Sequence, residues 1–141
     1  MKIVVYANVE KDWKERIQMP YGMAQFRSYV TRNFITSDLP YTHPSARAVP
    51  TDIIIWAFKE NDVWYLLGDG YVKSKFKVSA ESKEDNYWEF YIESARLYPR
   101  SVSMDELSFG AEKKSALNVS FVIDWKQYDE VLEKAGKPLV K

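Results

Sequence analysis

Aromatic side chains are the residues of this sequence whose type and placement could do chemistry. They make up 16% of the 141 residues, with five Trp, ten Tyr and seven Phe. A flat ring that stacks on a nucleic-acid base contributes about 1–3 kcal/mol per base. The rings from which we predict a base pocket are Trp13, Tyr21, Trp56, Phe76 and Trp88. The alternative is that each of them belongs to the hydrophobic core.

Two asparagines could complete such a pocket. The amide of Asn8, just after the first apolar run, or that of Asn33 could hydrogen-bond the edge of a flipped base. Trp56 also has a competing interpretation, because it and Trp64 belong to the two arms of an expected hairpin and would form a cross-strand pair there.

Basic residues accompany the aromatic ones. Lys73, Lys75 and Lys77 alternate along one segment, so a strand would place all three on one face. A strip of this kind can contact phosphates, which position a nucleic acid without reading its sequence. A charged edge that discourages aggregation between sheets would have the same pattern. Further candidate phosphate ligands are Arg32, Ser74 and Arg96.

Other chemistries find less support. His43 is the only histidine and there is no cysteine, whereas a structural or catalytic metal site usually needs several such ligands. We interpret His43 as an ordinary loop residue, since no nucleophile-elbow motif accompanies it. A magnesium-dependent nuclease remains an alternative, because Asp52 and Asp69 could approach each other across a hairpin and the loop 112–114 (Glu-Lys-Lys) resembles the end of a nuclease motif.

The overall charge limits the partners. Twenty Lys and Arg balance twenty Asp and Glu, so binding to nucleic acid requires a local patch rather than a global field. No apolar run approaches the length of a membrane span, and no signal peptide is evident. We expect a cytoplasmic protein without metal, cofactor or membrane partner.

Hydrophobic patterning predicts the elements that must position these side chains. Residues 9–17 favour a short helix, whereas 18–50 lack clear periodicity because prolines interrupt them. Gly68 and Gly70 suggest a bulge or bend. Ser103 with Glu106 predicts a capped short helix, and a last helix runs over 125–135. The expected strands are 3–7, 52–58, 63–68 continuing to 78, 87–98 and 117–123.

These elements imply an α+β domain, with a curved mixed β-sheet or partly closed β-barrel and short flanking helices. The domain covers residues 1–136, and 137–141 look like the start of a linker.

The order of motifs resembles PUA-like domains. The segment 49–56 (VPTDIIIW) resembles their entry into a central strand, and 65–72 (YLLGDGYV) resembles the return strand with its glycine. The segments 89–93 and 97–107 are similar to the strand, proline and short helix that follow. The closing segment 121–132 is similar to the last strand and helix of the EVE branch.

The resemblance implies a non-catalytic reader of modified bases, because the EVE and YTH branches take such a base into an aromatic cage. It places Asn8 and Trp13 in the pocket and makes Phe76 and Trp88 flank a wall-forming loop, residues 79–86. Related modules are the DNA-reading N-terminal domains of modification-dependent restriction complexes of the Mcr type, so the resemblance implies further domains or subunits as partners. RNA is the alternative ligand. The chain has Ala7-Asn8 where YTH domains have Lys-Ser, so the base is not specified.

Overall fold

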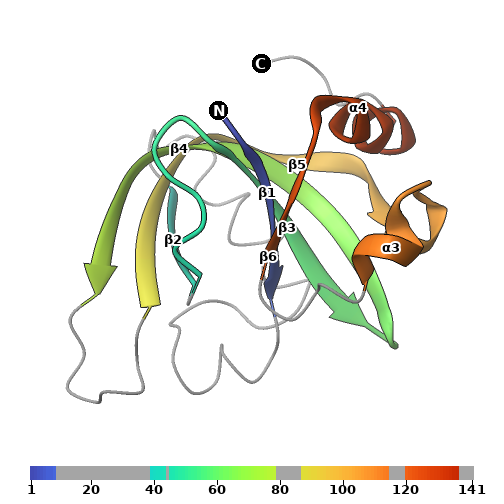
Figure 1. Ribbon diagram of the computed structural model, residues 1–141, viewed down its shortest axis with the longest axis horizontal. Coiled ribbons are helices and arrows are strands. Elements are labelled where there is room, and N and C mark those ends of the chain that lie inside the picture. Colours follow the sequence, from blue (N-terminus) through green and yellow to red (C-terminus); the bar gives the residue numbers. More distant parts are fainter. Residues whose placement is uncertain (9–38, 44, 79–86, 115–119, 137–141) are drawn as a thin grey trace.

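The computed structural model describes residues 1–8, 39–43, 45–78, 87–114 and 120–136. Its strands are β1 (Ile3–Asn8), β2 (Leu39–His43), β3 (Ile53–Glu60), β4 (Val63–Val78), β5 (Tyr87–Ser103) and β6 (Ser120–Ile123). They form one six-stranded sheet in the order β2-β5-β4-β3-β1-β6 (Figure 1). β1 and β3 are parallel and the other neighbouring strands antiparallel, so the sheet is mixed.

The sheet is curved, as predicted, but it is not a closed barrel. The long strands β4 and β5 arch across the molecule in Figure 1. The β4–β5 register shifts three times, between Leu66 and Gly68, between Asp69 and Tyr71, and between Val72 and Ser74. Such bulges bend a strand and increase its twist. The expected irregularity around the two glycines is therefore confirmed.

Gly68 is required by the close approach of β5. A Cβ atom at this position would lie 2.1 Å from the carbonyl oxygen of Arg96, which belongs to the backbone and cannot rotate away. The absence of a side chain is thus what allows the two strands to pack at this bend.

The hairpin between β3 and β4 confirms the turn predicted there. Asn61 and Asp62 both have positive φ, at 51° and 63°. Positive φ at both central residues is typical of the type I′ turn, whose twist matches that of the flanking strands.

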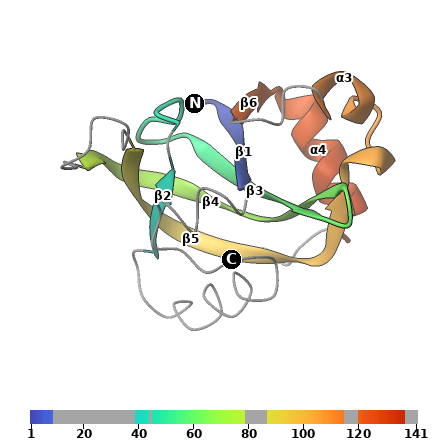
Figure 2. The ribbon, with the colours of Figure 1, turned by 90° about the horizontal axis from the view of Figure 1, so that it is seen from below.

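The described residues also form three short helices: the 3₁₀ helix η1 (Met104–Glu106), α3 (Gly110–Lys114) and α4 (Trp125–Lys134). The predicted capping box at η1 is confirmed, with Ser103 as its N-cap. α4 is capped by Asp124, which accepts from the Gln127 amide while the Gln127 side chain accepts from the Asp124 amide. The helices lie at one end of the sheet (Figures 1 and 2).

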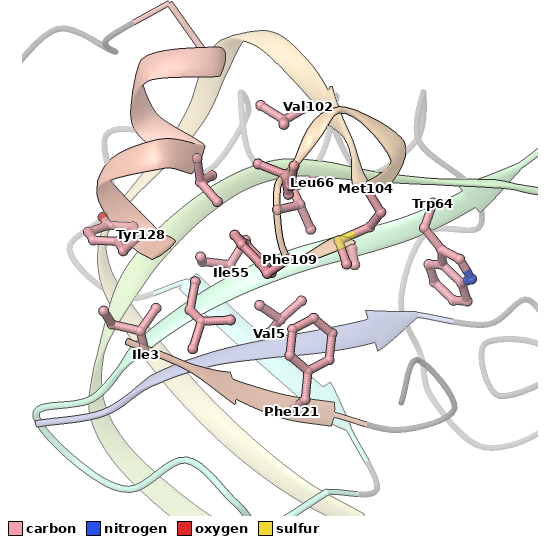
Figure 3. Close-up of a cluster of buried hydrophobic side chains, with 14 of the residues drawn as sticks. Ile3, Val5, Ile55, Trp64, Leu66, Val102, Met104, Phe109, Phe121 and Tyr128 are labelled. Carbon is pink, nitrogen blue, oxygen red and sulfur yellow. The ribbon is translucent and has the colours of Figure 1, made fainter. Parts of the chain in front are cut away.

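Two hydrophobic clusters cover the two faces of the sheet. The first contains Ile55, Trp64 and Phe121, together with side chains from the helices (Figure 3). The second lies on the opposite face and includes Trp56 and Phe90. Trp56 and Trp64 therefore belong to different faces, and their predicted cross-strand pairing is wrong. Trp56 is paired with Gly68 instead.

Several predicted boundaries also need correction. The strand expected over 87–98 continues as β5 to Ser103. Residues 98–101 lie at an irregularity between the paired residues Leu97 and Val102, and a proline is tolerated there. β2 occupies part of a segment for which no regular element was expected. Residues 112–114 belong to α3 rather than to a loop. The helix expected over 9–17 and the segment 137–141 lie outside the described residues.

Candidate nucleic-acid interface

Trp88 lies at the centre of the best candidate site, where β2, β5 and β4 run side by side. The register places His43 of β2 directly opposite Trp88 on one side and Lys77 of β4 opposite it on the other. Directly opposite residues of antiparallel strands point to the same face. The half-buried Trp88 also packs against the second hydrophobic cluster. Trp88 thus lies between His43 and Lys77 in the sheet.

Lys75 covers the ring of Trp88. Its Nζ lies 4.7 Å from the ring centroid, within the range of a cation–π interaction. The same Nζ donates a 2.7 Å hydrogen bond to the carbonyl oxygen of Ala46. Lys75 pairs with Phe90 of the second cluster, so Lys75 and Lys77 share one face. We name Lys75, Lys77 and Trp88 the Trp88 site.

Lys73 lies at an irregularity of β4. The register shift between Val72 and Ser74 makes Lys73 the extra residue of a bulge. Because a bulge interrupts the alternation of side chains, the register establishes a shared face for Lys75 and Lys77 alone. That Lys73 shares this face stays a prediction.

Phe76 and Ser74 lie on the other face of the same strands. Phe76 pairs with Glu89, the neighbour of Trp88 along β5, and consecutive strand residues point to opposite faces. Phe76 is 54% exposed and packs edge-on against Tyr91, with ring centroids 5.9 Å apart. Phe76 and Trp88 therefore lie on opposite faces of the sheet, which argues against the prediction that both belong to one base pocket.

His43 is a buried residue of β2, so the prediction that it is an ordinary loop residue is wrong. Its Nε2 lies 2.7 Å from the Ala7 carbonyl oxygen, and its Nδ1 accepts from the Ser45 amide. This pattern requires the hydrogen on Nε2. Burial lowers the pKa of His43 to about 4, so the ring is neutral near pH 7.

Asn8 is likewise enclosed. Its amide nitrogen donates to the carbonyl oxygens of Tyr6 and Ala57, both at 3.1 Å, and its Oδ1 accepts from the Tyr41 hydroxyl at 2.5 Å. Asn8 is 2% exposed and Trp56 is fully buried. Their positions argue against the predicted contacts with a base, because the amide is already satisfied and neither side chain reaches the surface.

Arg96 binds a carboxylate of the protein rather than lying ready for a phosphate. Its Nε donates to Asp69 Oδ1 at 2.8 Å, and its Nη2 donates to Oδ2 at 3.2 Å. Tyr98 and Tyr128 donate to the same Oδ2 at 2.8 and 2.7 Å. Burial and the Asp69 charge raise the pKa of both tyrosines, so both remain protonated donors. This network joins β4, β5 and α4.

The two carboxylates considered for a nuclease are separate and already paired. Asp52 accepts from the Lys2 and Val49 amides at 2.7 and 2.9 Å and forms a salt bridge with Lys2 Nζ. Asp69 lies further along the sheet opposite Ile55. Among the residues that the structure describes, no group of three or more His, Asp or Glu side chains could hold a metal ion. The nuclease alternative therefore gains no support.

Four predicted site residues lie outside the described ranges: Trp13, Tyr21, Arg32 and Asn33. Of the remaining ones, the structure brings together Trp88, Lys75 and Lys77. The sequence reasoning missed the neighbouring residues Tyr41 and His43. Their signal was the alternation of Leu39, Tyr41 and His43, all buried, which Pro40 obscured.

Comparisons with known proteins add no relative. No family model matches the chain, and neither the curated proteins nor the solved structures gave a match. Within the described ranges, none of the helices has the length and apolar character needed to cross a membrane. The functional argument therefore depends on the Trp88 site itself.

Proposed function

We propose that this chain is a non-catalytic nucleic-acid-binding module that stacks one base on Trp88. The observation that carries the proposal is the placement of one indole ring and two lysines, Lys75 and Lys77, on the same face of the adjacent strands β4 and β5. Stacking on such a ring is worth about 1–3 kcal/mol per base. The two ammonium groups supply positive charge that can contact the phosphates next to that base.

The ligand that we favour is DNA carrying a modified base, flipped out of the duplex. This choice comes from the resemblance to PUA-like readers, and it also fits a site with a single ring rather than a long stacking platform. Extraction of a base costs a few kcal/mol, which stacking and phosphate contacts must offset. Such a module would serve as the targeting domain of a restriction complex. RNA is the second ligand to test.

The exposed Phe76–Tyr91 pair on the opposite face is a separate surface. Since Phe76 is 54% exposed, it can contact a neighbouring part of a bound duplex or another domain, but it does not complete the pocket around Trp88. We therefore give it no part in base recognition.

Fluorescence-polarisation binding tests the proposal. The probes are duplexes identical except for one unmodified base, N6-methyladenine or C5-methylcytosine, and matched RNA, at fixed moderate salt. We expect preference for one modified duplex, and a loss of about 5- to 160-fold in Trp88→Ala. Trp125→Ala is the matched control, because this tryptophan is 51% exposed on α4. Equal affinity of wild type and Trp88→Ala for every probe would refute the role of Trp88.

A further inference from the structure

The ring of Trp88 is covered by Lys75 in the free protein, and this arrangement bears on which ligands the site accepts. We propose that Lys75 is a specificity-determining residue. Its ammonium group moves off the ring of Trp88 only when the incoming base has an anionic phosphate beside it. The proposal rests on the proposed function, because it assumes that a base stacks on Trp88. It identifies the ligand class as nucleotides within a strand, and it excludes free bases and nucleosides.

Two interactions hold Lys75 in place. Its Nζ lies 4.7 Å from the ring centroid of Trp88 and donates at 2.7 Å to the Ala46 carbonyl oxygen. Trp88 also packs against the second hydrophobic cluster, so part of the ring is already used by the core. A base that stacks on the ring must therefore take the position of the Lys75 ammonium group.

A ligand without phosphate gains too little from this exchange. It would break the cation–π contact and the hydrogen bond to Ala46 without providing a new partner for the ammonium group. A phosphate offers the ammonium group an acceptor that carries a full negative charge, whereas the Ala46 carbonyl oxygen is neutral, so the exchange adds an ion pair. Lys75 can then turn from the Ala46 carbonyl group to the phosphate while the base replaces it on Trp88.

Lys77 provides the comparison within the same site. It lies directly opposite Trp88 on the same face and is exposed. The ammonium group over the ring belongs to Lys75, which also has the contact with Ala46. Both lysines can attract phosphate. Their roles differ because Lys75 covers the ring of Trp88 and Lys77 does not.

The test compares two versions of one fluorescein-labelled single-stranded DNA 12-mer, prepared for each base tested above. One version has phosphodiester linkages throughout, and the other has neutral methylphosphonate linkages on both sides of the central base. Each is titrated against wild type, Lys75→Ala, Lys77→Ala and Lys75→Arg. Circular dichroism of each variant verifies that it is folded.

We expect wild type to bind the methylphosphonate strand at least about tenfold more weakly than the phosphodiester strand. Lys75→Ala should bind the methylphosphonate strand about fivefold more tightly than wild type does, because the ring is uncovered. Lys77→Ala should show no such gain, and Lys75→Arg should keep the wild-type preference, since a guanidinium group can also cover the ring.

The outcomes separate this inference from the proposed function. If Lys75→Ala binds the methylphosphonate strand no better than wild type, Lys75 is only a phosphate contact and the inference is wrong, while the proposed function stands. If Lys77→Ala gains as much as Lys75→Ala, the effect is not due to the cover and the inference is also wrong. If wild type binds none of the phosphodiester strands or duplexes, the proposed function itself fails.

Discussion

The hydroxyl group of Tyr128 on α4 donates a 2.7 Å hydrogen bond to Oδ2 of Asp69 on β4, across 59 residues of sequence. The same carboxylate accepts from Tyr98 and from Arg96, and Asp69 is 4% exposed. A buried carboxylate with four donor contacts joins the last helix to the two longest strands. The arrangement makes Asp69 a structural anchor rather than a metal ligand.

Replacement of Asp69 by Asn should destabilise the fold strongly. The variant leaves the guanidinium group of Arg96, whose side chain is 15% exposed, without its counter-charge. Breaking a buried ion pair from one side costs about 3–5 kcal/mol. Tyr128→Phe, which removes one hydrogen bond, should cost about 1 kcal/mol. Urea denaturation measures both, and equal costs for the two variants would contradict the anchor role.

Stability should fall as the pH decreases from about 6.5 to about 4 because of His43. Burial depresses the pKa of this histidine to about 4 from its ordinary value of 6.5. The unfolded chain therefore binds the proton first, and the contribution of His43 is complete above pH 6.5 and lost as the pH falls toward 4. Between these two pKa values, His43 contributes up to about 1.4 kcal/mol per pH unit to the slope of the unfolding free energy against pH.

The variant His43→Gln isolates this effect. Chemical denaturation of wild type and variant at several pH values gives two stability curves, and their difference removes the contribution of carboxylates such as Asp52, whose pKa is also lowered. The difference should shrink as the pH falls through the window. A difference that is constant between pH 7 and pH 4 would show that His43 does not titrate as its burial requires.

A methyl group at Gly68 should be poorly tolerated. The added Cβ of Gly68→Ala would meet the Arg96 carbonyl oxygen at 2.1 Å, and the β4–β5 backbone would have to separate. Overpacking of this kind costs about 1–3 kcal/mol. Thermal unfolding measures the loss, with Ser74→Ala on the same strand as a control that should stay within about 0.5 kcal/mol. If Gly68→Ala were as stable as Ser74→Ala, the close approach of Gly68 to the Arg96 backbone would be contradicted.

The salt dependence of binding should reveal the role of Lys77. Each phosphate neutralised on duplex DNA contributes about 0.9 to the slope of log affinity against log salt concentration. Lys77→Ala should reduce this slope by about 0.9, whatever the base. Lys59→Ala serves as control, because Lys59 lies at the hairpin end of β3 and pairs with Asp62. Fluorescence polarisation at several salt concentrations gives the slopes, and equal slopes for Lys77→Ala and wild type would exclude a phosphate contact.

The elements with strong local signals could be predicted from the sequence alone. β1 and β3 are runs of β-branched and apolar residues, and both were expected. α4 begins at Trp125, as the pattern indicated. These predictions succeed because hydrophobic periodicity and helix caps act over a few residues. The helical pattern also predicts Trp125 in the core beneath this helix, and that prediction is wrong, since its side chain is 51% exposed. The pattern alone does not determine which side chains the sheet covers.

Tertiary structure decided the composition of the candidate site. The sequence indicated that Lys75, Lys77, Phe76 and Trp88 were close, but it could not separate the two faces, since this requires the β4–β5 register. The register pairs Lys77 with Trp88 and Phe76 with Glu89, so Lys77 shares the face of Trp88 whereas Phe76 lies on the other face. In a strand, a shift by one residue exchanges the faces, so partners distant in sequence determine which side chains meet.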